Sequence, residues 1–201
     1  MMPDAVTPFH LAVPEAELDD LRARLHATRW PERETVQDDS QGVRLAELQA
    51  LCTGWADEYD WRVVEAELNA VPQFRTTIDG LGIHFLHARS PHDDALPLVM
   101  THGWPGSVVE FLDVIGPLAD PSAHGGDTAD AFHVICPSLP GYAWSAKPTT
   151  LGWGVERIAK AWAALMDRRG TSDTAHKAPT GEPASRRASV LSTATAWPGS
   201  T

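Results

Sequence analysis

The sequence predicts an α/β fold preceded by a helical region, and two observations carry this prediction. The runs "LPLVMT" (96–101) and "AFHVICPS" (131–138) are short, almost continuously apolar and bounded by turn residues, which is typical of strands buried on both faces of a sheet. Each run is followed by an amphipathic segment with helical spacing. This order of strand and helix indicates a parallel sheet with crossover helices.

The first seventy residues predict helices. The segment "PEAELDDLRARLHATRW" puts leucines on one helix face, and "RLAELQALCTGWADEYDW" repeats the pattern before "DWRVVEAELNA" continues it. Three tryptophans, Trp30, Trp55 and Trp61, lie in this region. Because indole rings bury a large area, we expect these helices to pack on a large apolar surface of the core.

From residue 74 the apolar period changes to two. Segments on either side of a turn at 79–82, "DGLG", predict a β-hairpin. The two buried strands follow, each with its amphipathic helix, in "GSVVEFLDVIGPLAD" and "GVERIAKAWAALMDRR". Residues 170–201 are rich in Ser, Thr, Ala, Pro and Gly and have no apolar period, so they predict a disordered tail.

Composition excludes several kinds of function. A formal net charge of −11 argues against nucleic acid as a partner, because that affinity depends on Lys and Arg. The sequence contains no apolar run near eighteen residues and no basic, apolar leader, so we expect a cytoplasmic protein without a membrane span. Cys52 and Cys136 are expected to be reduced packing residues. His84 and His87 stand three apart on a strand and point to opposite faces, so no metal site is expected.

Two loops follow the buried strands. In open parallel sheets the chemistry lies beyond the carboxyl ends of the strands, where "HGWPG" (102–106) and "SLPGYAWSAKP" (138–148) are placed. Ser107 is a candidate N-cap for the helix after the first loop. No GxSxG surrounds it, so it is not expected to be a nucleophile.

The order of "RWPERETV", "WADEYDWRVVEAELNAVPQFRTTIDGLGIHFLHARS", "PLVMTHGWPGSVVEFLDVIGPLAD" and "FHVICPSLPGYAWSAKP" resembles epoxide hydrolases of the α/β-hydrolase superfamily, in the microsomal and juvenile-hormone group. The likeness covers about residues 7–169. It implies an N-terminal epoxide hydrolase region at 1–110, packed on a truncated α/β-hydrolase core at 74–169 that overlaps it, and a tail at 170–201. It also implies a small hydrophobic epoxide as substrate, and no cofactor or metal.

The resemblance assigns roles to both loops. The HGxP loop, His102, Gly103, Trp104 and Pro105, would form part of an oxyanion hole, with the N–H of Trp104 as a donor. His102 would brace the loop through its ring nitrogens and would not be the catalytic base. Trp104, Tyr142 and Trp144 are candidates for the substrate pocket, with core packing the favoured role for Tyr142. Ala143 and Trp144 replace the Gly and Phe usual in the family's PGYGFS, so the dihedral angles of this loop are an open point.

The family's remaining catalytic groups are absent from the printed sequence. The nucleophilic Asp usually stands in GGDWG shortly after the helix that ends here at Arg169, and no such string occurs; nor do the cap tyrosines, carboxylate partner and catalytic His. Suitable codons for 170–183 permit HERYGAQGADWGA in another reading frame, with the Asp codon spanning Pro179 and Thr180. We therefore hypothesise a frameshifted, truncated epoxide hydrolase that is inactive as printed.

Two alternatives stay open at this stage. Haloalkane dehalogenases carry a similar HGxP, although the "RWP" and "YDW" elements favour epoxides. The chain could also be a noncatalytic interaction module that occupies the docking surface of a full-length partner. The sequence predicts no particular oligomeric state.

Overall fold

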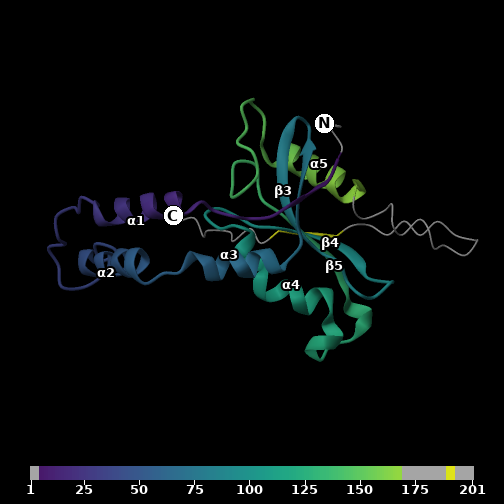
Figure 1. The fold of residues 1–201 in the computed structure, drawn as a ribbon, viewed down its shortest axis with the longest axis horizontal. Helices are drawn as coiled ribbons and strands as arrows, with labels where there is room; N and C mark the ends of the chain where they lie inside the picture. The colour runs from purple at the N-terminus through teal and green to yellow at the C-terminus, as the bar shows by residue number, and fades with distance from the viewer. Residues whose placement is uncertain (1–4, 169–188, 193–201) are drawn as a thin grey trace, which may run out of the picture. The chain divides into compact units, whose positions relative to one another are not determined.

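The protein forms two compact units in a computed structural model that describes residues 5–168 and 189–192. One unit is Leu11–Ala66, and the other combines Met1–His10 with Glu67–Thr201, within the described ranges. Figure 1 shows the helices of the first unit and the sheet of the second. None of the helices in the described ranges is long and apolar enough to cross a bilayer.

The first unit contains α1 (Glu15–His26), α2 (Leu45–Asp57) and the start of α3 (Trp61–Ala70). Acidic residues in the first turn of α1 and basic residues in its last turn suit the helix dipole. The bounds of α1, α2 and α3 confirm the three helices predicted for this region. The Trp55 side chain is 48% exposed and is therefore not buried, although tryptophans in this region were expected to pack on an apolar surface.

One charged network holds the segment before α1 against the first turn of α3. Arg62 contacts Glu15 at 2.8 Å and Glu65 at 2.6 Å. Glu65 also accepts hydrogen bonds from the N–H of Val13 at 2.6 Å and from the indole N–H of Trp61 at 3.2 Å. These bonds, with the one from Val13 the largest influence, hold the pKa of Glu65 below its ordinary value.

The second unit is built on a mixed sheet of six strands in the order β1-β2-β3-β5-β4-β6. The strands are β1 (Thr7–Phe9), β2 (Gln73–Ile78), β3 (Leu81–Ala88), β4 (Leu96–Thr101), β5 (Phe132–Pro137) and β6 (Ser189–Ser192). Strands β1, β2, β3 and β5 pair antiparallel, whereas β4 pairs parallel with both β5 and β6. The two predicted buried strands are thus parallel neighbours, as expected.

The predicted hairpin is confirmed, with a shorter turn than expected. Strands β2 and β3 pair from Gln73↔Leu86 to Ile78↔Leu81, which leaves only Asp79 and Gly80 in the turn. Their φ angles are 51° and 79°, and a two-residue turn with both φ positive matches the right-handed twist of the strands. Leu81 and Gly82, which were expected in the turn, belong to the strand.

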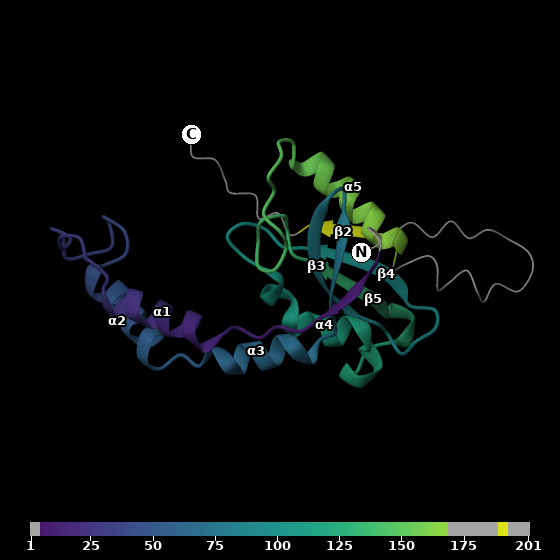
Figure 2. The same ribbon diagram turned by 45° about the horizontal axis from the view of Figure 1, so that its top comes forward.

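Helices cover both faces of this sheet. The predicted segment 106–120 begins as a 3-10 turn, η1 (Val108–Phe111), and continues as α4 (Leu112–Ala119). Ser107 is its N-cap, because its hydroxyl accepts a 3.3 Å hydrogen bond from the N–H of Val109. Helix α5 (Val155–Met166) packs Trp162 and Leu165 on the sheet. Figure 2 shows α4 and α5 on opposite faces, the layered arrangement of an α/β fold.

Two short 3-10 turns, η2 (Pro121–His124) and η3 (Thr128–Asp130), connect α4 to β5. The expected disordered tail, 170–201, lies outside the described residues except for β6. There the structure differs from the expectation, because Ser189–Ser192 pair with Leu98 to Thr101 of β4. The apolar edge of β4 therefore has a strand beside it.

Candidate functional site

The candidate site lies at the carboxyl ends of the parallel strands β4 and β5. The loop at 102–106 leaves β4, and the loop at 138–148 leaves β5. The two loops contact one another directly. The N–H of Leu139 donates a 3.1 Å hydrogen bond to Nε2 of His102, and the His102 and Tyr142 rings meet edge to face with centroids 5.4 Å apart.

The hydrogen bonds of His102 determine its tautomer. Because the Leu139 N–H donates to Nε2, that nitrogen carries no proton, and the proton is on Nδ1. Nδ1 then donates to the carbonyl oxygen of Gly103 at 3.3 Å. The residue is only 2% exposed, and burial lowers its pKa, which keeps the ring neutral. With both nitrogens engaged, His102 is placed to brace the loop and has no free nitrogen to act as a base.

The bond from His102 to Gly103 also orients the next N–H. The Gly103 carbonyl and the Trp104 N–H belong to one trans peptide group, so they point in opposite directions. Holding the carbonyl toward the His102 ring therefore directs the Trp104 N–H away from it. Among the described residues this N–H has no hydrogen-bond partner. Pro105, joined to Trp104 by a cis peptide bond, contributes no N–H of its own.

Gly106 lies beside the side chain of Glu110. A Cβ built on Gly106 would overlap the Glu110 carboxylate, which is the far end of a flexible side chain and can move aside. The φ of Gly106 is outside the left-handed region, so its backbone conformation is one that other residues also adopt. The negative charge of Glu110 also opposes the effect of burial on the pKa of His102, although burial dominates.

The second loop is a tight turn with two residues in the left-handed region. Gly141 has φ 85° and Ala143 has φ 42°. The N–H of Tyr142 donates a hydrogen bond to the Leu139 carbonyl oxygen at 2.9 Å. The N–H of Ser145 donates one to the Tyr142 carbonyl oxygen at 3.0 Å. Ala143 thus occupies a conformation that favours glycine, the residue usual in the resembled motif.

The three candidate pocket residues have different surroundings. The Trp104 ring is 79% exposed, and the Tyr142 ring packs on His102. Trp144 contacts His84 edge to face at 5.2 Å and lies 6.3 Å from the Phe9 ring. Among the described residues no ring contact joins these three side chains. Trp144 therefore packs against β1 and β3, and the role of the three side chains in a substrate pocket stays a prediction.

Residues 6–111 match the family model described as epoxide hydrolase N terminus, which covers more than half of the chain. The chain belongs to the epoxide hydrolase family. It is 64% identical over 165 residues to a "Putative epoxide hydrolase" of Stigmatella aurantiaca, covering 82% of this chain and 38% of that protein. It is 34% identical over 171 residues to "Epoxide hydrolase 1" of Oryctolagus cuniculus, covering 83% of this chain and 38% of that protein.

Solved structures agree with this assignment. The epoxide hydrolase of Aspergillus niger matches with a TM-score of 0.73 and 34% identity, over 84% of this chain and 44% of that one. Juvenile hormone epoxide hydrolase from Bombyx mori matches with a TM-score of 0.71 and 29% identity, over 83% and 44%. The resemblance and the α/β-hydrolase type of fold are therefore confirmed. The chain spans about 38% of the length of the two curated relatives named above.

This epoxide hydrolase family member also contains a buried polar network that the sequence did not indicate. Its side chains come from Gln73, His84, Ser138 and Ser145, and each residue is less than one tenth exposed. The sequence predicted only that His84 lies on a strand and does not share a metal site with His87. The only signal in the sequence was a histidine in an apolar strand, and its partners are up to 61 positions away.

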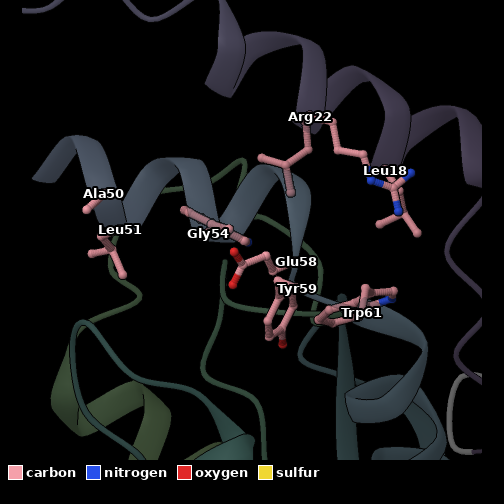
Figure 3. Close-up of a pocket in the computed structure, with 10 residues that line it drawn as sticks. Leu18, Arg22, Ala50, Leu51, Gly54, Glu58, Tyr59 and Trp61 are labelled. Carbon is pink, nitrogen blue, oxygen red and sulfur yellow. The ribbon is translucent and has the colours of Figure 1, made fainter.

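A separate apolar hollow of about 780 Å³ lies within the helical unit, between α1, α2 and the start of α3. Figure 3 shows Glu58, Tyr59 and Trp61 gathered where α2 ends. Arg22 also lines this hollow, and its guanidinium group forms ion pairs with Glu15 and Asp19.

In the described ranges no three His, Cys, Asp or Glu residues are grouped to hold a metal ion. The loops at the sheet edge therefore remain the candidate site of this family member.

Proposed function

We propose that this chain supplies one half of the oxyanion hole of an epoxide hydrolase whose substrate is a small hydrophobic epoxide. The overall reaction adds water to the epoxide and gives a vicinal diol, with no metal or cofactor. The observation that supports the proposal most is the Trp104 N–H. It has no hydrogen-bond partner among the described residues, and the His102 bond to Gly103 fixes its direction.

The chemistry explains why such a donor is useful. In the mechanism that the family resemblance implies, an Asp carboxylate attacks an epoxide carbon, the carbon–oxygen bond of the ring breaks, and an ester forms. Water then adds to the ester carbonyl, whose oxygen gains negative charge. A preorganised backbone N–H aimed at that oxygen stabilises the charge, and removing one such donor slows other hydrolases by about 10²–10³-fold. The Trp104 N–H would be one donor, and the residue after the nucleophile would supply another.

The chain by itself is proposed to be inactive. Its sequence contains no GGDWG string, which is where the family's nucleophilic Asp usually stands. Without that Asp no ester forms, and the loop has no negative charge to stabilise. Purified chain incubated with styrene oxide or stilbene oxide should form no diol above a buffer blank. Diol formation that scales with protein concentration and survives further purification would refute this part of the proposal.

A further inference from the structure

The buried network around His84 connects the centre of the sheet to the candidate site. His84 belongs to β3. Its Nδ1 lies 2.9 Å from the Ser138 hydroxyl, and its Nε2 lies 2.9 Å from Oε1 of Gln73. The Gln73 amide nitrogen donates to the Leu68 carbonyl at 3.1 Å and to Oδ1 of Asn69 at 3.0 Å, which turns Oε1 toward His84. Since Oε1 can only accept, Nε2 of His84 carries the proton, and Nδ1 accepts from Ser138.

The main chain of His84 holds the same loop. The N–H of Ser138 donates to the His84 carbonyl at 2.9 Å. The N–H of His84 donates to the Ser145 hydroxyl at 3.0 Å, and that hydroxyl donates to the Ser138 carbonyl at 2.7 Å. Both the side chain and the backbone of His84 therefore fix Ser138, and buried bonds of this kind are costly to break.

Ser138 is followed directly by Leu139, whose N–H donates to Nε2 of His102. His102 in turn donates from Nδ1 to the Gly103 carbonyl, which shares its peptide group with the Trp104 N–H. A continuous path of bonds thus runs from His84 through Ser138, Leu139 and His102 to Trp104. Each step depends on the position of the one before it.

We propose that His84 is a positioning residue for the Trp104 N–H, acting through Ser138, Leu139 and His102. It does not touch the substrate or the reacting atoms. The proposal rests on the proposed function only for the role given to Trp104. The relay itself is tested on the full 201-residue chain without substrate.

The test compares two buried histidines of the same strand. His84→Leu removes both polar contacts of the ring while keeping an apolar side chain in the space. His87→Leu is the control, since His87 is also buried, at 5% exposed, but its ring lies against Phe74. In each variant, NMR measures the hydrogen exchange of the Leu139 amide and the ¹⁵N signal of His102 Nε2.

We expect exchange of the Leu139 amide to be about tenfold or more faster in His84→Leu than in His87→Leu. A change of this size corresponds to weakening one hydrogen bond. The His102 Nε2 signal should move in His84→Leu and stay in place in His87→Leu. His84→Asn, whose side-chain oxygen can accept from Ser138, should restore most of the protection. This rescue separates positioning from general loss of stability.

Equal effects of the two leucine variants, or no effect of either, would overturn the proposal. If His84→Leu does not fold, Ser138→Ala gives the same readout by removing one hydroxyl, and an unchanged Nε2 signal in that variant also contradicts it. Because neither measurement requires turnover, failure of the relay and failure of the proposed activity are distinguishable.

Discussion

The N–H of Leu139 lies 3.1 Å from Nε2 of His102, and this hydrogen bond joins the loops that follow β5 and β4. It fixes the tautomer of the His102 ring and leaves Nδ1 to hold the Gly103 carbonyl. The direction of the Trp104 N–H follows from these two contacts. Replacing His102 should therefore affect both stability and the geometry of the candidate site.

His102→Phe should lower the free energy of unfolding by about 1–3 kcal/mol, because it leaves a partly buried N–H on Leu139 without its acceptor. The ring would still pack on Tyr142. The matched control is His124→Phe, at an exposed position, which should change stability by less than about 0.5 kcal/mol. Urea unfolding followed by tryptophan fluorescence measures both. Equal stability of His102→Phe and the unaltered chain would contradict the role given to this bond.

Ala143→Gly should stabilise the protein by about 1 kcal/mol, because φ of 42° costs an L-residue more than it costs glycine. Ala146→Gly in the same loop is the control, since Ala146 has no positive φ and should lose stability through the greater freedom of the unfolded chain. Thermal unfolding of the two variants should shift in opposite directions. If Ala143→Gly instead lowered the free energy of unfolding, the positive φ of Ala143 would not be a source of instability.

The protein should lose stability as the pH falls from neutral, partly through His84. Burial, assisted by the charge of Arg75, lowers the pKa of His84 from 6.5 to about 3. The unfolded chain then binds a proton that the folded chain does not, so the contribution is complete above pH 6.5 and is lost toward pH 3. One such group gives a slope of at most about 1.4 kcal/mol per pH unit.

Chemical unfolding at several pH values between 6.5 and 5 measures this slope above the range in which the carboxylates titrate. His84→Asn, which cannot be protonated, should show a smaller slope than the unaltered chain. The slope that remains in this variant includes His102, whose pKa burial also lowers. The same slope in both proteins would exclude His84 as a source of the acid sensitivity.

The nucleotide sequence tests the frameshift hypothesis. If one base has been lost near the codon of Arg169, the bases that encode Pro179, Thr180 and Gly181 should contain GAC followed by TGG in the shifted frame. Sequencing the gene from independent template DNA supplies the answer. Any other bases at these positions would rule out the proposed elbow.

Much of the fold could be predicted from local sequence patterns. The period of two around Asp79 and Gly80 indicated the hairpin, and Ser107 was recognisable as an N-cap because capping depends on neighbouring residues. Strand β1 was missed because three residues, Thr7–Phe9, are too few to show a period. Its formation depends on pairing with Phe74 and its neighbours, far away in sequence.

The candidate site could be predicted only in part, for a similar reason. The HGxP loop was recognisable as a motif, whereas the packing of Trp144 on His84 and Phe9 depends on three separate strands and loops. The bond from His84 to Ser138 joins residues 54 positions apart. Contacts at such distances follow from sheet order, which one sequence does not specify.

The most direct test of the proposed oxyanion role uses a chimera in which residues 7–169 replace the corresponding segment of the Stigmatella aurantiaca relative, which is 64% identical over 165 residues. Single-turnover reactions with styrene oxide would follow the ester and the diol separately. His102→Phe in the chimera should slow hydrolysis of the ester by about tenfold or more while ester formation changes little, so that the ester accumulates. Equal rates of ester hydrolysis with and without the substitution would contradict the account.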